Sequence, residues 1–324
     1  MLHGGSLTDV AGLSVGHATR ADRPTGCTVV LCPQAVVCGV DVRGGAPGTR
    51  ETDLLRSENT VDRVHAVLLT GGSAFGLDAA GGVMRWLDER GHGLAVGPAR
   101  VPIVPAAVLF DLWLGDPRLR PDAALGFAAC NAAHAGAVEC GSVGAGAGAT
   151  VGKLFGIERA MKAGIGSASL RVGAFTMAAL VAVNALGDVV EADGRLIAGA
   201  RGADGRLPCG ARDRLLAGDA AMRVMAGMAT TIGVVATDAL LTKPQANKLA
   251  SLAHHGLSRA IDPLTVHDGD TLFALATGQA GRPGDLSVLG AMAAEAVARA
   301  IRHAARAAQG LSEPWLPAWR ELQP

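Results

Sequence analysis

The sequence contains no tyrosine, and aromatic residues make up only 3% of its 324 residues. A core with so few rings must be built from aliphatic side chains packed around turns, and glycine occurs 45 times. Charge is also sparse: charged residues make up 18% of the chain, and the formal net charge is zero. A neutral chain without basic blocks gives no electrostatic reason to expect a nucleic acid or an anionic membrane as a partner.

Paired cysteines and long apolar runs are missing as well. None of the six cysteines belongs to a C-x-x-C motif, and Cys27, Cys32 and Cys38 lie in an apolar strand pattern, which favours buried free thiols. No apolar stretch reaches the ~18 uncharged residues of a membrane span. The first residues lack the charged and apolar regions of a signal peptide. We therefore expect a cytoplasmic protein.

What the sequence does contain is a regular alternation of apolar strands and helices. Hydrophobic residues make up 49% of the chain, and neither an internal repeat nor a linker between two cores is evident. The pattern predicts a single domain over residues 1–324 with a layered α/β or α+β fold. We expect strands at 27–31, 35–41, 65–70, 177–184, 230–238 and 270–278, and helices at 73–91, 121–134, 213–225, 242–261 and 285–309.

Three familiar site motifs fail on detail. The glycine-rich segment 141–156 is no phosphate-binding loop, because Ala147 stands where the first glycine belongs and Leu154 where the hydroxyl belongs. In "GGSAFG", Phe75 replaces the second glycine of a nucleophile elbow. There is no H-E-x-x-H motif, so a metal site is poorly supported. The glycine loop instead brings Lys153 to a site, unless Lys153 is an ordinary solvated lysine.

The clearest chemical pattern pairs a threonine with two carboxylates. In "GMATTIGVVATDA", Thr230 begins an apolar strand, and in "VHDGDTLF", Asp268 and Asp270 stand two residues apart, so they share a face of an extended segment. Each has an ordinary alternative, a strand-start threonine and a D-G-D turn. Thr231 is the near rival of Thr230.

A threonine hydroxyl needs a base to become a nucleophile, and its own α-amino group, with a pKa of about 7.7–8.0, can serve. That amine becomes free only when the Ala229–Thr230 bond is cut. Ala229 is small, so little obstructs attack of the Thr230 hydroxyl on the preceding carbonyl. The chain would then consist of fragments 1–229 and 230–324.

These stretches resemble the L-aminopeptidase/D-esterase family, which includes the β-aminopeptidases and the nylon-oligomer endohydrolases. The resemblance covers nearly the whole chain. It rests on "DVRGGAPGTRETDLL", "VHAVLLTGGSAFGLDAAGGVMRWLDERG", "VGAGAGATVGK", "VAVNALGDVV", "TTIGVVATDA" and "HDGDTLFALATG". It implies a four-layer αββα sandwich, self-cleavage into two subunits that stay together, and a hydrolase acting on amide or ester bonds of N-terminal amino acids.

Carried over by motif, the resemblance makes Thr230 the nucleophile and Asn184 the asparagine that helps to hold the oxyanion. Lys153 matches a lysine that lines the nylon-hydrolase site, and Asp268 and Asp270 match the pair that orients the nucleophile. The substrate's free amine needs an acidic partner, for which Asp111 and Asp268 are candidates along with Asp78. No metal or organic cofactor is implied.

Two positions depart from the family pattern. The residue before the nucleophile is commonly asparagine or glycine, but here it is Ala229. A tyrosine near the family's site is replaced by Phe110, in "VLFDL", whose ring donates no hydrogen bond. The related ornithine acetyltransferases share the sandwich and cut themselves at an Ala–Thr bond, so acyl transfer is the alternative activity, and an unprocessed binding protein is another.

The partners we expect follow from this assignment. They are a small peptide or amide substrate and further copies of the chain. The C-terminal tail, with Trp315 and Trp319, is suited to clasp a neighbouring subunit, and tetramers are common in the family.

Overall fold

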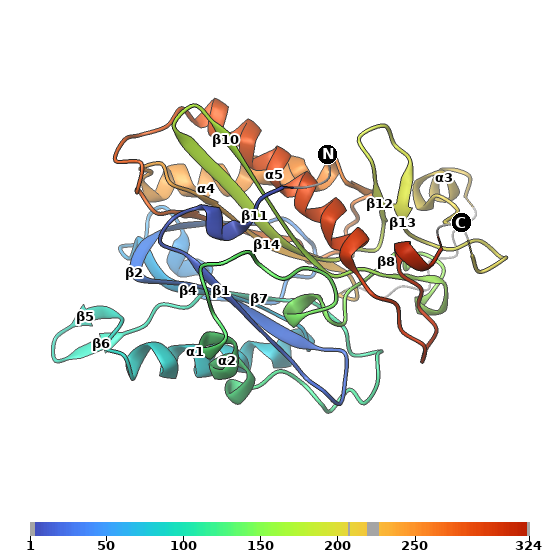
Figure 1. Cartoon of the computed structure of the whole chain (residues 1–324), viewed down its shortest axis with the longest axis horizontal. Coiled ribbons are helices and arrows are strands. Elements are labelled where there is room, and N and C mark those ends of the chain that lie inside the picture. The colour runs from blue at the N-terminus through green and yellow to red at the C-terminus, as the bar shows by residue number, and fades with distance from the viewer. Residues whose placement is uncertain (1–3, 207, 219–226, 323–324) are drawn as a thin grey trace.

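The computed structural model describes residues 4–206, 208–218 and 227–322, and these form four layers (Figure 1). Helices α4 (Lys243–Ser258) and α5 (Leu286–Ala307) cover one side. Helices α1 (Ala79–Asp88) and α2 (Ala123–Asn131) cover the other. Two layers of strands lie between the helix pairs, which confirms the predicted αββα sandwich.

The strands form one path, in the order β10-β11-β14-β16-β2-β4-β7-β3, with β1 paired to β2. The 17-residue strand β2 joins the two layers, because it pairs with β16 through residues 37–42 and with β1 and β4 mainly through its first half. Two pairs, β14 with β16 and β4 with β7, are parallel. The bounds are β1 Ser14–Thr19, β2 Gly26–Val42, β3 Thr49–Arg50, β4 Arg63–Thr70, β7 Ala106–Val108, β10 Ile165–Val172, β11 Phe175–Asn184, β14 Thr230–Thr237 and β16 Thr271–Ala276.

Side-chain alternation along the strands separates the cores. The odd-numbered residues 177–183 of β11 pack with α4 and α5, and the even-numbered residues 178–182 pack between the two strand layers. In β14, residues 232, 234 and 236 also face the space between the layers. A third core lies between β2, β4 and the helices α1 and α2. By this alternation, Asn184 and Thr230 belong to the row between the strand layers.

Two expected strands prove to be one. Residues 27–31 and 35–41 both belong to β2, and the pairing with β4 shifts register between Leu31 and Val36. Pro33 lies inside this irregularity, where its missing N–H breaks no regular ladder hydrogen bond, and Ala35 adopts a left-handed φ of 58°. An irregularity within β2 therefore lies where the sequence indicated a break between two strands.

Two helix predictions also needed correction. The expected helix at 73–91 begins as a 3-10 helix, Ser73–Asp78, before α1, and Phe75 in this segment is 56% exposed. The expected helix at 213–225 is present as α3, Ala211–Leu216, and residues 219–226 lie outside the described residues.

Short strands and turns complete the described chain. The short strands are β5 Leu94–Val96, β6 Ala99–Val101, β8 Thr150–Val151, β9 Met161–Lys162, β12 Asp188–Val190, β13 Leu196–Ala198 and β15 Ile261–Asp262. Further 3-10 turns lie at Leu7–Asp9, Asp53–Leu55, Gly144–Gly146, Ile157–Arg159 and Trp319–Glu321.

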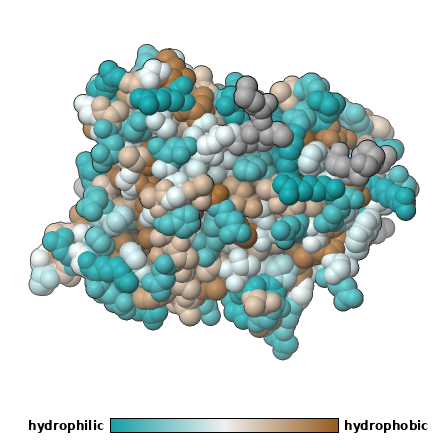
Figure 2. Space-filling model, viewed as in Figure 1, coloured by the Kyte–Doolittle hydropathy of each residue, from teal (hydrophilic) through white to brown (hydrophobic). Residues whose placement is uncertain are grey.

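All six cysteines are free thiols, and four of them are buried, as their apolar surroundings predicted. Across the described residues, none of the helices combines the length and the apolar character that crossing a membrane requires. The face shown in Figure 2 carries apolar side chains scattered among hydrophilic ones.

Candidate active site

The candidate nucleophile and the candidate oxyanion donor face each other across two strands. Strands β11 and β14 are antiparallel, and the last pair of their register is Asn184 with Thr230. Directly paired residues project to the same face of a sheet, with their Cβ atoms about 5 Å apart. Both side chains are buried, at 0% and 3% exposure. Residues 46 positions apart in sequence are thus brought together at one end of the layer between the sheets.

The bond expected to be cut lies at the start of β14. The carbonyl oxygen of Ala229 accepts a hydrogen bond from the Gly269 N–H at 2.9 Å, and the Thr230 hydroxyl contacts the same oxygen. The Gly269 N–H polarises this carbonyl. The second contact places the Thr230 hydroxyl oxygen close to the carbonyl group that it would attack. Ala229 is fully buried and forms a bridge with Asp268.

Gly269 is a site residue that sequence reasoning missed. A Cβ at this position would lie 2.9 Å from the Thr230 hydroxyl and 2.5 Å from the carbonyl oxygen of Ala46, so any side chain would crowd the nucleophile. The signal was present in the sequence as the glycine of "DGD", which we interpreted only through its two carboxylates.

The amide of Asn184 is held on both sides. Its Oδ1 accepts from Lys153 Nζ at 2.9 Å and from the Thr150 N–H at 3.1 Å. Both partners are donors, which establishes that the atom facing them is the oxygen. Its Nδ2 donates to the carbonyl oxygen of Phe110 at 3.0 Å. Among the described residues this is its only acceptor, so the second Nδ2 hydrogen remains available to an oxyanion.

Lys153 is 1% exposed, which excludes the solvated-lysine alternative. Its ammonium donates to the Asn184 carbonyl oxygen at 2.7 Å and to the Thr150 carbonyl oxygen at 2.9 Å, besides Asn184 Oδ1. Burial lowers the pKa of Lys153 to about 7, and the negative charge of Asp268 opposes this shift. Thr150, the second donor to Asn184, was not singled out from the sequence.

The two carboxylates hold the backbone around the nucleophile. Asp270 Oδ1 accepts from the Thr231 N–H at 2.6 Å. Asp268 accepts from the Leu186 N–H at 3.2 Å, and from the Thr265 N–H at 3.0 Å and hydroxyl at 2.6 Å. Burial and the charge of Asp268 hold the pKa of the Asp270 carboxyl well above its usual range. Both residues thus lie at the site, with their hydrogen bonds going to residues beside Thr230.

A surface cavity of about 350 Å³ reaches Asp270. Its lining comprises Arg43, Gly44, His254, His255, Ser258, Leu264, Thr265, Val266 and Asp270. Within the described part of the chain, no three histidine, cysteine, aspartate or glutamate side chains gather as ligands for a metal ion.

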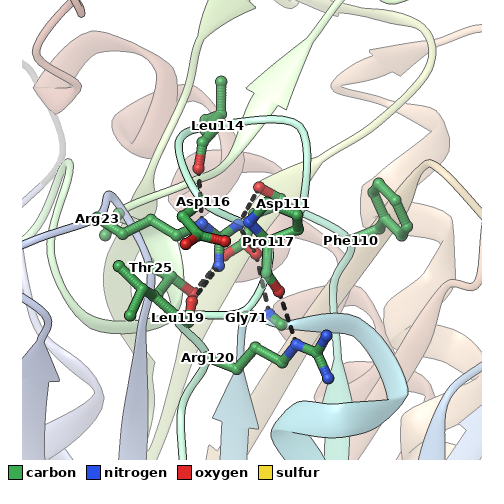
Figure 3. A network of polar contacts seen from close by, with 12 residues as sticks. Arg23, Thr25, Gly71, Phe110, Asp111, Leu114, Asp116, Pro117, Leu119 and Arg120 are labelled. Atoms are coloured by element: carbon green, nitrogen blue, oxygen red, sulfur yellow. Dashed lines mark hydrogen bonds and ion pairs between the residues drawn. The ribbon is translucent and has the colours of Figure 1, made fainter.

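Phe110 and Asp111 follow β7 and lie on the opposite strand layer from Thr230. The carbonyl oxygen of Phe110 accepts a hydrogen bond from Asn184 Nδ2, whereas the Phe110 ring packs edge-on against Trp113 with 4.9 Å between centroids. Figure 3 shows the Phe110 ring apart from the polar cluster around Asp111. The ring itself has no hydrogen bond to offer in place of the family's tyrosine.

The expected contact between Asp111 and a substrate amine does not fit the geometry. The Asp111 carboxylate is completely buried and pairs with Arg23 Nη2 at 2.8 Å. It also accepts from the Thr25 hydroxyl at 2.6 Å and from the Gly72 N–H at 3.0 Å. An amine would have to displace these partners to reach it. Arg23 and Thr25, in "RPTGC", were not predicted as site residues.

Comparisons with known proteins agree with this fold. The family model described as peptidase family S58 matches residues 5–314. A protein of Mycobacterium leprae named as an uncharacterized aminopeptidase is 43% identical, over 95% of this chain and 91% of its own. A 6-aminohexanoate-oligomer endohydrolase of Kocuria sp. is 34% identical, over 92% and 85% of the two chains.

A solved structure carries the same fold. The L-aminopeptidase D-Ala-esterase/amidase of Ochrobactrum anthropi, described as a variant of the N-terminal-nucleophile hydrolase fold, superimposes with a TM-score of 0.70 at 22% identity. The superposition covers 96% of this chain and 88% of that one. The chain therefore belongs to peptidase family S58 and is an aminopeptidase-type hydrolase with the N-terminal-nucleophile fold.

Proposed function

We propose that this hydrolase cuts its own chain between Ala229 and Thr230 and then uses Thr230 as an N-terminal nucleophile. It would release N-terminal amino acids from small peptides, amides, esters or β-peptides. The observation that carries the proposal is the cross-strand pairing of Thr230 with Asn184, beside a carbonyl that already accepts a hydrogen bond from Gly269.

Self-cleavage would begin with attack of the Thr230 hydroxyl oxygen on the Ala229 carbonyl carbon. The hydroxyl proton passes to the departing amide nitrogen, the Ala229–Thr230 C–N bond breaks, and an ester joins Ala229 to the Thr230 oxygen. Water then hydrolyses the ester. The Gly269 N–H supports the developing oxyanion because it is already placed at 2.9 Å from the same oxygen.

Catalysis would repeat this chemistry on a substrate. The freed Thr230 amine accepts the proton of its own hydroxyl, directly or through a water, and the oxygen attacks the substrate carbonyl. The free Nδ2 hydrogen of Asn184 stabilises the oxyanion, while Lys153 keeps the amide in this orientation. The leaving amine departs with a proton, and water hydrolyses the acyl-enzyme. These steps call on the chain's own residues and require no cofactor.

The fold explains why two fragments would remain one protein. Strands β14 and β16 belong to fragment 230–324, yet they lie between β11 and β2 of fragment 1–229. Separating the fragments would break both ladders and expose the cores on both faces of the sheet. We therefore retain a single domain, 1–324, that is cut and still held together.

The substrate class is supported by the names of two relatives, an aminopeptidase and an oligomer endohydrolase. We propose that this chain likewise hydrolyses amides. An acyltransferase would instead move acetyl from acetylornithine to glutamate, and that assay separates the two activities.

We further propose a cytoplasmic homo-oligomer, with a tetramer expected. The free thiols suit a reducing compartment. Trp315 is 51% exposed in the C-terminal tail, where a neighbouring subunit would cover it. Light scattering of the purified protein tests the oligomer.

The nucleophile is tested by denaturing intact-mass spectrometry and by amino-acid p-nitroanilide turnover. The wild-type chain should give two masses that meet at Ala229/Thr230. Thr230→Ala should give one uncut mass and no activity above background. The matched control is Thr231→Val, which keeps the shape of a buried side chain whose hydroxyl has no hydrogen-bond partner among the described residues. It should be cut and active, and a cut, active Thr230→Ala protein would refute the assignment.

A further inference from the structure

Two of the three residues that bind the Asn184 amide come from segments without regular structure of their own. Phe110 lies beyond the end of β7, and Lys153 follows the two-residue strand β8 in the glycine-rich loop. An oxyanion donor must be held to within a fraction of an ångström, because a misplacement of about 1 Å can cost about 100-fold in rate. Something must therefore hold both segments in place behind the site.

The buried pair Arg23–Asp111 is placed to hold the first segment. Figure 3 shows the Arg23 side chain reaching toward Asp111, Leu114 and Leu119. Its guanidinium binds the Asp111 carboxylate at 2.8 Å and also the Asp111 carbonyl oxygen. The same group donates to the carbonyl oxygens of Leu114 at 2.6 Å and Leu119 at 2.8 Å. The loop is thus tied to one rigid, planar cation.

Asp111 controls the orientation of the Phe110 carbonyl through the peptide bond between them. That unit is planar, so fixing the backbone of Asp111 at one end restricts the direction of the Phe110 C=O at the other. Asp111 is fixed by its side chain and by its main chain, both of which bind Arg23. The Phe110 oxygen then has a defined position in which to receive Asn184 Nδ2 at 3.0 Å.

The same carboxylate also supports the second segment. A Cβ at Gly148 would lie 2.6 Å from Asp111 Cβ and 2.8 Å from Oδ2, so the glycine loop rests directly on Asp111. Two residues later the loop reaches Thr150, and then Lys153, which together hold Asn184 Oδ1. One buried side chain therefore contacts both segments that orient the amide.

We propose that Asp111, held by Arg23, is a positioning residue that aims the Asn184 amide at the oxyanion. Burying an ion pair stabilises a fold poorly compared with apolar packing of the same volume, so its value here lies in specifying one geometry. The proposal rests on the proposed function of Asn184. It replaces the substrate contact that the sequence suggested for Asp111.

The test measures kcat and KM for an amino-acid p-nitroanilide, per cut chain as counted by mass spectrometry. Asp111→Asn keeps the size of the side chain and removes its charge. We expect kcat to fall about tenfold with KM changed less than about twofold, because transition-state stabilisation is lost and substrate binding is not. Asp116→Asn, in the same loop and ion-paired with the exposed Arg118, is the control and should retain wild-type kcat.

A double-mutant cycle separates positioning through Asn184 from a general structural effect. In an Asn184→Ala background, Asp111→Asn should cause no further fall in kcat, because the amide that it aims is gone. A tenfold loss in both backgrounds would overturn the proposal. If Asn184→Ala by itself retains full activity, the oxyanion role of Asn184 fails instead, which distinguishes the two failures.

A milder variant covers the case in which Asp111→Asn does not fold. Thr25→Val removes only the 2.6 Å hydrogen bond to Asp111 Oδ2 and keeps the β-branched shape. We expect a twofold to fivefold fall in kcat, smaller than for Asp111→Asn because the carboxylate keeps Arg23 and the Gly72 N–H, and again absent in the Asn184→Ala background. An unchanged kcat in Thr25→Val, or an equal loss in both backgrounds, would count against the proposal.

Discussion

Lys153 and Lys162 are alike in burial and different in what they hold. Both are at most 1% exposed, and burial lowers the pKa of each to about 7. Lys153 Nζ holds the Asn184 side chain and main chain. Lys162 Nζ donates instead to the carbonyl oxygens of Ala147 and Ala149, both at 2.8 Å, within the glycine loop.

The difference shows that a perturbed lysine is not by itself a catalytic one. Burial is the largest cause of both pKa shifts, so the shift does not distinguish the two regions. The acceptors do: Lys153 binds the side chain of Asn184, which faces the nucleophile, whereas Lys162 binds backbone oxygens of the glycine loop. The sequence pattern pointed only to Lys153, through the resemblance at "TVGK".

The largest expected effect is a difference in kcat between variants of the two lysines. Lys153→Met should lower kcat about 100-fold or more, because Asn184 loses the partner that orients its amide, an effect similar to losing an oxyanion donor. Lys162→Met is the matched control and should stay within about tenfold of wild type. Equal losses in the two variants would mean that burial of the lysine, and not its contact with Asn184, is what activity requires.

The next effect concerns the pH dependence of stability, to which the two lysines should contribute alike. With both pKa values lowered to about 7 from 10.5, the unfolded chain binds more protons than the folded one between those pH values. The free energy of unfolding should therefore rise with pH from about 7 to 10.5, by up to ~1.4 kcal/mol per pH unit for each lysine. Below pH 7 both states bind these protons, and the contribution becomes constant.

Urea unfolding at pH 7, 8 and 9 measures this slope, in the Thr230→Ala background so that a single chain unfolds. Lys153→Met and Lys162→Met should each flatten the rise by a similar amount. A slope that neither substitution changes would show that other groups release the protons.

The smallest expected effect concerns Phe110. Since the carbonyl, and not the ring, contacts Asn184, Phe110→Leu should change kcat less than about threefold. Phe110→Tyr, which restores the hydroxyl of the family pattern, is the companion variant, measured in the same p-nitroanilide assay. A loss of tenfold or more in Phe110→Leu would assign the ring a direct role in the reaction.

Prediction from sequence succeeded where local pattern and tertiary structure agree. Strand β14 was expected at 230–238 and is found at Thr230–Thr237. Strand β11 was expected to end at residue 184, and it does. It failed where a neighbour overrides the local signal. Two separate strands were expected at 27–31 and 35–41, but pairing with β1, β4 and β16 joins them in the single strand β2.

The site shows the same division. Carboxylates two residues apart were predicted to act together, and both are at the site. Their hydrogen bonds go to Thr231, Leu186 and Thr265, because the approach of other segments decides which donors they meet. Gly269 was overlooked because its importance lies in the space beside Thr230, which no local pattern reports.

The sequence by itself determined which chemical groups exist and which of them share a strand face, because side-chain alternation is a local property of the backbone. It thus determined a layered fold of helices and strands and the place of Thr230 at the head of an apolar strand, whereas the αββα order came from the family resemblance. Only the tertiary structure decided that Asn184 lies opposite Thr230 and that Lys153 is buried against Asn184. It also decided that Asp111 is buried in an ion pair with Arg23. These contacts join residues from 31 to 88 positions apart, and their geometry depends on how whole layers pack.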